Sequence, residues 1–119
     1  MLLTHMSPGN ETYFKWAEKA YDWLEGVGYI TGDDNPPAYR VLDGAGEESN
    51  CTEFHLLRWS YNVAMLLNGA AVMYNVTQDP IWEERVLGLW NQSNIFFKDN
   101  IMWEPACEIP HTCDTDQIK

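Results

Sequence analysis

The sequence contains few basic residues. Seven Lys and Arg stand against 18 Asp and Glu, which gives a formal net charge of -11 at pH 7. A surface of this sign repels nucleic-acid phosphates and anionic lipids, so the composition argues against a nucleic-acid-binding protein. Long apolar runs are also lacking, and the first residues have neither the basic start nor the apolar run of a signal peptide. We therefore expect no membrane span and no signal peptide in this chain.

Cysteine is scarce, and its odd number is informative. The sequence has three cysteines, and in a secreted protein an odd count leaves one thiol in need of a partner. The short spacing from Cys107 to Cys113, with Pro110 between them, suits a local disulfide. Cys51 lies far away, and the sequence does not identify its partner. A zinc site is disfavoured because His111 lies inside this loop and no second Cys-x-x-Cys pair exists, so we predict no metal site and no cofactor.

Aromatic residues, by contrast, are abundant. Six Trp, six Tyr and 45% hydrophobic residues indicate a folded, carbohydrate-compatible protein rather than a disordered chain. The length of 119 residues fits one domain or part of one. Secretory passage is indicated by Asn-x-Ser/Thr acceptor sequences for N-glycosylation, which occur at Asn10, Asn50, Asn75 and Asn91.

Apolar periodicity predicts an amphipathic helix over residues 12–27. Its expected apolar face consists of Trp16, Ala20, Trp23 and Val27, opposite regularly spaced charged residues. Gly26 and Gly28 should end this helix, and the Gly-, Asp- and Pro-rich residues 32–46 should form a loop.

Two further helices are expected. The first should begin between Asn50 and Thr52, with Asn50 as its cap, and run to about Tyr74. Because residues 63–74 are almost entirely apolar or small, this helix should be buried on all sides. The second should begin with Asp79 and Pro80. Its expected apolar face consists of Ile81 or Trp82, Val86, Leu89 and Trp90.

This order predicts an all-α fold. Half-exposed and buried helices alternate, which is typical of the outer and inner layers of an α/α toroid or an α-solenoid. Strands are nowhere strongly indicated. Residues 100–116 should form a loop, and Asp116 should begin another helix.

Several motifs resemble a known family. Trp59-Ser60-Tyr61-Asn62, followed by residues 66–75, is similar to the inner-helix signature of glycoside hydrolase family 76, the fungal mannan endo-1,6-alpha-mannosidase family. Residues 103–108 and 113–117 resemble the Cys-bridged loop and the following Asp-Gln helix start of its fungal members, and residues 12–28 resemble the preceding outer helix. The resemblance extends from about Gly9 to the end of the chain.

The resemblance implies a fold and an activity. Members are (α/α)6 barrels several times this length, so we expect residues 1–119 to be a fragment of one catalytic domain that lacks the upstream half and the C-terminal part. The expected function is hydrolysis or transglycosylation of α-1,6-mannosyl linkages in fungal cell-wall biogenesis. The implied substrate is α-1,6-mannan or a glycosylphosphatidylinositol-type glycan. The resemblance also implies a secreted protein at the cell wall or cell surface. Because many family members are membrane-anchored at the C-terminus, the parent protein is expected to carry a glycosylphosphatidylinositol anchor.

The family's catalytic pair is two adjacent Asp residues at the start of an upstream inner helix, and nothing here matches that context. Asp33-Asp34 offers the two carboxylates that a retaining glycosidase places ~5 Å apart. However, Asn35-Pro36-Pro37 follows and cannot open a helix in the same way, so a solvated acidic loop is the preferred interpretation. We assign no catalytic residue and expect the chain alone to be inactive.

Substrate-binding candidates lie where helices begin. Trp59, Tyr61 and Asn62 can stack on a sugar ring and hydrogen-bond its hydroxyls, although core packing of both aromatics is an equal alternative. Asp116 and Gln117 occupy the equivalent place at the next helix, where Asp116 can also be simply a cap. Three further residues are weaker candidates: His55, interpreted as a residue of the first helical turn, and the loop carboxylates Glu104 and Glu108.

Two alternatives remain open. One is a non-enzymatic α-helical interaction or carbohydrate-binding module, in which the aromatics serve packing or recognition alone. The other is a different α/α-barrel sugar enzyme, such as an unsaturated-glycan hydrolase, which the Trp-Ser-Tyr-Asn and Cys-loop motifs disfavour.

Overall fold

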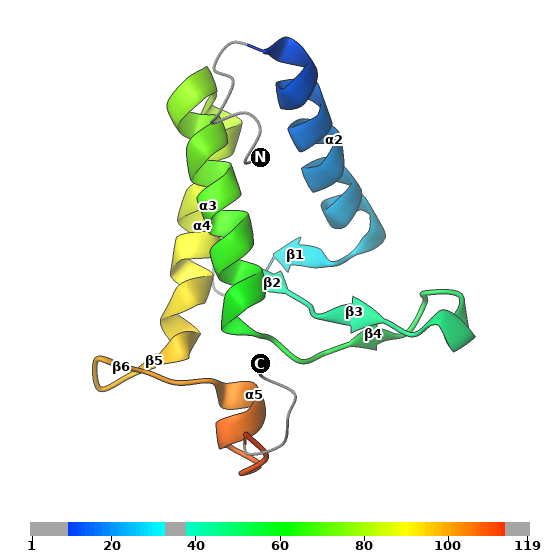
Figure 1. Ribbon diagram of the computed structural model, residues 1–119, viewed down its shortest axis with the longest axis vertical. Coiled ribbons are helices and arrows are strands. Elements are labelled where there is room, and N and C mark those ends of the chain that lie inside the picture. The colour runs from blue at the N-terminus through cyan, green and yellow to red at the C-terminus, as the bar shows by residue number, and fades with distance from the viewer. Residues whose placement is uncertain (1–9, 33–37, 114–119) are drawn as a thin grey trace.

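The computed structural model describes residues 10–32 and 38–113. Most of them are helical, as the sequence predicts. The helices are α2 (Glu11–Val27), α3 (Ser60–Thr77), α4 (Pro80–Ser93) and the short α5 (Pro105–Glu108). In Figure 1, α3 and α4 lie side by side, α2 stands opposite them, and α5 lies beyond the first turn of α3. None of the described helices is long and apolar enough to cross a membrane.

Short strands, which the sequence did not strongly indicate, are also present. Within residues 10–32 and 38–113, three two-stranded antiparallel ribbons lie between the helices. They are β1 (Ile30–Gly32) with β2 (Tyr39–Val41), β3 (Gly44–Ala45) with β4 (Phe54–His55), and β5 (Phe97–Lys98) with β6 (Ile101–Met102). Strands of two or three residues are too short to show an alternating apolar pattern, which explains why sequence periodicity does not indicate them. Pairing satisfies backbone groups that an irregular loop would leave to water.

The boundaries of α2 agree with the sequence. The Asn10 side chain accepts a hydrogen bond from the Thr12 backbone N–H at 3.1 Å and so caps the helix. At the other end Gly28 adopts φ = 93°, a left-handed conformation that glycine adopts without steric cost. A side chain at this position would also approach the ring of Phe54, because a Cβ would lie 3.3 Å from it.

The predicted apolar face of α2 is wrong. Trp16 and Trp23 are 65% and 57% exposed, whereas Ala17 and Tyr21 are buried. The helix carries two apolar stripes at helical spacing, and periodicity alone cannot choose between them. The stripe that contains Ala17 and Tyr21 packs into the core of the described residues.

The helix α3 begins about ten residues later than predicted. Asn50 and Cys51 have φ values of 52° and 61°, in the left-handed region, so the backbone at Asn50 cannot open a right-handed helix. His55 consequently lies in β4, exposed and opposite Gly44, and not in a first helical turn. The residues predicted to form the first turns of the helix instead contain β4, which follows a 3₁₀ turn at Glu47–Ser49.

Burial of α3 on all sides is also not observed. Val63, Ala70 and Met73 are buried, but Met65 is 74% exposed. An apolar composition allows a helix to be buried on all sides, but it becomes buried only where other elements pack against each side. In the described chain α4 contributes the most extensive helix contact of α3, and the face that carries Met65 is open.

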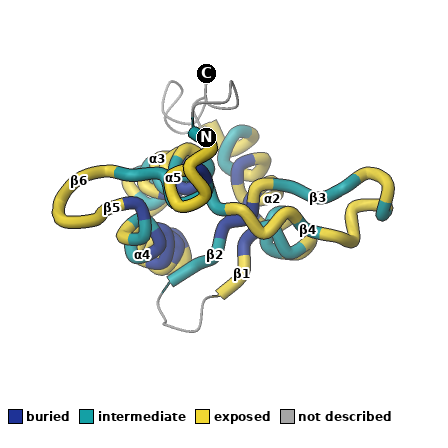
Figure 2. The backbone as a smooth tube through the Cα atoms, turned by 90° about the horizontal axis from the view of Figure 1, so that it is seen from below, coloured by how far each residue is buried: buried dark blue, intermediate teal, exposed yellow. Residues whose placement is uncertain are grey.

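The helix α4 begins as predicted and buries part of the predicted face. Asp79 accepts a hydrogen bond from the Ile81 backbone N–H at 3.0 Å, and Pro80 is the first helical residue. Trp82 and Leu89 are buried, but Trp90 is 60% exposed. Figure 2 shows buried residues, in dark blue, in α4 and in β1 and β2.

The link between α2 and α4 includes a charged residue. Arg85 of α4 is 4% exposed and lies between the rings of Tyr21 and Trp82, at 4.2 and 4.4 Å from their centroids. Its guanidinium donates to Asp22 at 2.6 Å and to Glu25 at 3.1 Å. These two carboxylates lie on α2, so the pair of helices is joined by charge as well as by apolar packing.

Candidate functional site

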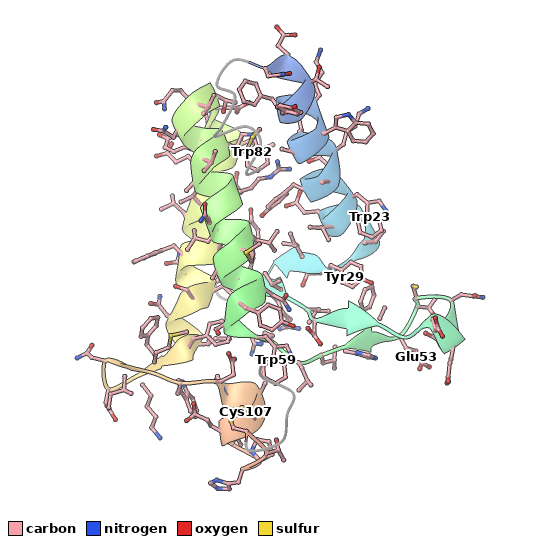
Figure 3. The ribbon with its side chains drawn as sticks, viewed as in Figure 1. Trp23, Tyr29, Glu53, Trp59, Trp82 and Cys107 are labelled. Carbon is pink, nitrogen blue, oxygen red and sulfur yellow. A yellow bond between two sulfur atoms is a disulfide. The ribbon has the colours of Figure 1, made fainter. Side chains whose placement is uncertain are left out.

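The first turn of α3 brings three of the predicted binding residues together. Trp59 lies immediately before the helix in an extended conformation, and its ring stacks on that of Tyr61, with centroids 6.5 Å apart and planes inclined by 22°. Tyr61 is 56% exposed and Trp59 is half-buried, so these rings are not enclosed core residues. Figure 3 shows Trp59 at the end of α3 that faces α5.

A residue that sequence reasoning missed completes this cluster. Asp43, in the short link between β2 and β3, accepts a hydrogen bond from the Tyr61 hydroxyl at 3.0 Å and another from the Asn62 amide at 3.1 Å. Both bonds end on the same oxygen, Oδ1. The backbone N–H of Asp43 donates to the Leu57 carbonyl at 3.2 Å, which places Asp43 beside the start of α3. Nothing local marked Asp43, since it stands in a segment that composition identified only as a loop.

The carboxylate of Asp43 raises the pKa of the Tyr61 phenol. Its hydrogen bond to the hydroxyl is the largest cause of a raised pKa of Tyr61, and partial burial and the charge of Asp43 raise it further. The Asn62 side chain acts in the opposite direction, and the charge of Glu104 adds a smaller increase to the pKa. A tyrosine phenol is protonated at neutral pH even at its ordinary pKa, and the raised pKa of Tyr61 extends this donor state to higher pH.

This arrangement makes the titration of Tyr61 a test of the cluster. In Asp43→Asn we expect the pKa of Tyr61 to fall toward the ordinary tyrosine value. The carboxylate favours the protonated phenol twice, as a hydrogen-bond acceptor and as a nearby negative charge, and the variant removes the charge. NMR titration of the Tyr61 ring signals measures the shift. Asp99→Asn, on the β5–β6 turn, is the matched control; a pKa of Tyr61 that stays unchanged or rises in Asp43→Asn would contradict the assignment.

A groove begins beside Asp43 and Asn62. It has a volume of about 440 Å³ and runs between the end of α2 and the first turns of α3. Apart from these two polar residues its walls are mainly apolar and include Trp23, Tyr29 and Met65. The Trp23 and Tyr29 rings lie 5.9 Å apart, so one wall is aromatic. Volume and lining are those of a pocket for a small organic ligand.

The predicted loop carboxylates are close to this site but are already used in hydrogen bonds. Both carboxylate oxygens of Glu104 lie 3.2 Å from the Ser60 backbone nitrogen, and Oε2 lies 2.6 Å from the Ser60 hydroxyl. Glu108 accepts a hydrogen bond from the Glu104 backbone N–H at 2.7 Å. Within the described residues no group of three or more His, Cys, Asp or Glu could hold a metal ion.

The disulfide predicted from the cysteine spacing is present. Cys107 and Cys113 are joined, with Cα atoms 4.8 Å apart, and Cys51 is an exposed free cysteine. Asp33, Asp34, Asp116 and Gln117 lie outside the described residues. Of the glycosylation candidates, Asn10, Asn50 and Asn75 are exposed and Asn91 is half-buried; their modification stays a prediction.

Aromatic faces beside amide, hydroxyl and carboxylate groups are suited to a carbohydrate. A pyranose ring presents C–H faces that pack on aromatic rings and hydroxyls that both donate and accept. Trp59 and Tyr61 supply the rings, and Asn62 and Asp43 supply the polar groups.

Comparison with known proteins agrees with this chemistry. The model of the family described as glycosyl hydrolase family 76 matches residues 2–119. The chain is 42% identical over 109 residues to mannan endo-1,6-alpha-mannosidase DCW1 of Saccharomyces cerevisiae, which is 92% of the chain and 24% of that protein. It is 41% identical over 109 residues to DCW1 of Candida glabrata, with the same coverage. The chain thus spans about a quarter of the length of these curated relatives.

A solved structure resembles the fold as well. The crystal structure of Dfg5 from Chaetomium thermophilum in complex with glucosamine is 45% identical to the chain and superposes with a TM-score of 0.74. The match covers 83% of this chain and 23% of that one.

Proposed function

The chain belongs to glycosyl hydrolase family 76, and from this premise we propose that it contributes part of the sugar-binding site of a mannan endo-1,6-alpha-mannosidase. The observation that carries the proposal is the cluster at the start of α3, where the Trp59–Tyr61 stack lies beside the Asn62–Asp43 hydrogen bond. Relatives about 40% identical over most of the chain bear this enzyme name.

The proposed architecture is part of an (α/α)6 barrel. In it α2 and α4 are outer helices and α3 is an inner helix. The apolar composition of α3 supports this proposal, because its exposed Met65 face then has a partner. The helices also run alternately in direction, as Figure 1 shows, which is the arrangement of helices in such a barrel.

The proposed binding mode assigns a role to each side chain. A mannose ring packs on the exposed face of Tyr61 with Trp59 behind it, and the Asn62 amide and Asp43 carboxylate hydrogen-bond its hydroxyls. The solved relative was crystallised with glucosamine, also a hexose-derived sugar, which supports a pyranose site in this fold. We include Asp116 and Gln117 in the proposed site from the sequence alone.

The proposed reaction is the retaining mechanism of two carboxylates. One carboxylate attacks the anomeric carbon while the other protonates the departing oxygen, and the glycosyl-enzyme is then opened by water or by a sugar hydroxyl. Water gives hydrolysis and a sugar hydroxyl gives transglycosylation. We place neither carboxylate among the described residues, because Asp43 and Glu104 both hold neighbouring groups of this chain.

We also propose a secreted protein of the cell wall or cell surface, acting on α-1,6-mannan or a glycosylphosphatidylinositol-type glycan. Four N-glycosylation acceptor sequences and the Cys107–Cys113 disulfide support passage through an oxidising compartment. Three of the four acceptor asparagines are exposed.

Binding of α-1,6-mannotetraose tests the proposal. We expect the chain to bind this oligosaccharide, and Trp59→Ala to weaken the affinity about tenfold, because losing an aromatic stacking contact costs about 1.4 kcal/mol. Isothermal titration calorimetry measures both affinities. Trp16→Ala is the matched control, since Trp16 is an exposed tryptophan on α2 outside the site.

One result would contradict the proposed mannan specificity, and another would contradict our interpretation of Asp33 and Asp34. Equal affinity for maltotetraose, an α-1,4-linked glucan of the same length, would remove the mannan specificity. If the chain turns over α-1,6-mannan and Asp33→Asn or Asp34→Asn abolishes this activity, our interpretation of Asp33 and Asp34 as a solvated loop pair is overturned.

A second candidate is a carbohydrate-binding module without catalysis. It is favoured by the same stack of Trp59 and Tyr61, because recognition needs no catalytic carboxylate. A full-length protein that contains this chain and turns over α-1,6-mannan would exclude it; binding by that protein without turnover would favour it.

A further inference from the structure

The helix α3 lacks a cap of its own. Trp59 occupies the capping position but makes no side-chain hydrogen bond to the helix, and the first turn contains no acidic residue. The first backbone N–H groups of a helix have no partner within it, and they attract negative charge. By comparison, α2 and α4 are capped locally by Asn10 and Asp79.

The missing cap is supplied by Glu104, which lies 44 residues further along the chain. Its two oxygens are equidistant from the Ser60 backbone nitrogen, at 3.2 Å, and the Ser60 hydroxyl donates to one of them at 2.6 Å. Ser60 stands between Trp59 and Tyr61 in the sequence. Glu104 therefore holds the residue on which the spacing and tilt of the two stacked rings depend.

Glu104 is itself held from both sides. On the N-terminal side, Trp103 donates its backbone N–H to the Phe96 carbonyl at 3.0 Å and its indole N–H to the Ile95 carbonyl at 2.9 Å. On the C-terminal side, the Cys107 backbone N–H donates to the Glu104 carbonyl at 3.1 Å. Cys107 is buried and is bonded to Cys113, so the disulfide closes the turn that begins at Glu104.

We propose that Glu104 is a positioning residue of the sugar site, which fixes the Trp59–Tyr61 stack by capping α3 from the disulfide-closed turn. This inference rests on the proposed function of the stack. It assigns to Glu104 no contact with substrate: the carboxylate acts through Ser60. It also gives the disulfide a role at the site, because the bond restrains the turn that presents Glu104.

Two variants of Glu104 test the inference. In Glu104→Ala we expect the affinity for α-1,6-mannotetraose to fall about tenfold, because the released Trp59–Tyr61 stack then has to be ordered when the sugar binds, at a cost of about 1.4 kcal/mol. In Glu104→Gln, which keeps an acceptor oxygen without the charge, we expect a loss of about threefold. Glu83→Ala, an exposed acidic residue in the first turn of α4, is the control and should leave the affinity unchanged.

A spectroscopic readout separates positioning from general loss of structure. NMR signals of the Ser60 amide and the Trp59 indole should move in Glu104→Ala, while the indole signal of buried Trp82 should not. The double variant Cys107→Ala/Cys113→Ala should move the same two signals in the same direction. If Glu104→Ala does not fold, Glu104→Gln carries the same comparison.

The outcomes are distinguishable. Lost affinity together with shifted Ser60 and Trp59 signals supports the positioning role. If the unaltered chain binds and both Glu104 variants bind equally well, the positioning role is overturned and the proposed function stands. Ser60 and Trp59 signals that do not shift in Glu104→Ala lead to the same conclusion. Absence of binding by the unaltered chain overturns the proposed function, and the positioning role with it.

Discussion

Replacing Asp22 and Glu25 together by Asn and Gln is expected to lower the free energy of unfolding by about 3 kcal/mol. The reason is the environment of Arg85, whose side chain is only 5% exposed. Burial alone lowers the pKa of Arg85, but its hydrogen bond to Asp22 and the charge of Glu25 outweigh that effect and raise the pKa. The double variant therefore leaves a buried cation without counter-charge.

The expected loss in the free energy of unfolding depends on how deeply Arg85 and its two carboxylate partners are buried. Removing one partner of a buried ion pair costs about 3–5 kcal/mol when the remaining charge stays buried. Asp22 and Glu25 are 56% and 34% exposed, and water already weakens their attraction to Arg85, which places the expected cost at the lower end of that range.

Arg85→Met is the matched control for this prediction. It removes the buried charge and fills a similar volume, and the carboxylates it leaves behind can be solvated, so we expect a loss of about 1 kcal/mol. Urea denaturation followed by far-UV circular dichroism measures all three proteins. A larger loss in Arg85→Met than in the double variant would show that packing of the guanidinium between Tyr21 and Trp82, and not its charge, carries the stability.

Truncation of Trp82 to Ala is expected to cost about 3–5 kcal/mol. Trp82 is 2% exposed and meets the Tyr21 ring edge to face, with ring centroids 5.3 Å apart. The guanidinium carbon of Arg85 lies over the Trp82 ring, 4.4 Å from its centroid. The variant loses the transfer free energy of a large aromatic side chain, leaves a cavity and removes both ring interactions.

Trp90 provides a control on the same helix. It is 60% exposed, so Trp90→Ala should change the free energy of unfolding by no more than about 0.5 kcal/mol. Both variants can be compared by urea denaturation. Similar losses for Trp82→Ala and Trp90→Ala would contradict the described packing of α4.

These two tryptophans also show how far sequence reasoning extended. Asp79 and Pro80 identified the start of the helix, and the pattern Ile81 or Trp82, Val86, Leu89, Trp90 identified two of its buried residues. The pattern included Trp90 wrongly. Hydropathy indicates that a side chain can be buried, but not whether another element of the structure packs against it. The same limitation explains the wrong prediction for α2. This helix has two apolar stripes, and the neighbouring elements pack against the stripe of Ala17 and Tyr21 rather than that of Trp16 and Trp23.

The site shows a similar division. Trp59, Tyr61 and Asn62 could be singled out because they are adjacent in the sequence and precede an apolar run. Asp43 and the capping role of Glu104 could not, since their partners lie 18 and 44 residues away and no local pattern specifies these contacts. Family resemblance identified the loop that contains Glu104, but the contact with Ser60 had to be observed.

The sequence by itself determined the mainly helical fold, the caps at Gly28 and Asp79, the local disulfide and the family, because these depend on neighbouring residues or on motifs that can be read in order. Only the tertiary structure decided where α3 begins, which stripe of α2 is buried, and how Asp43 and Glu104 hold the start of α3. The physical reason is that burial and long-range hydrogen bonds are properties of pairs of segments, and their free energies depend on partners that no local pattern specifies.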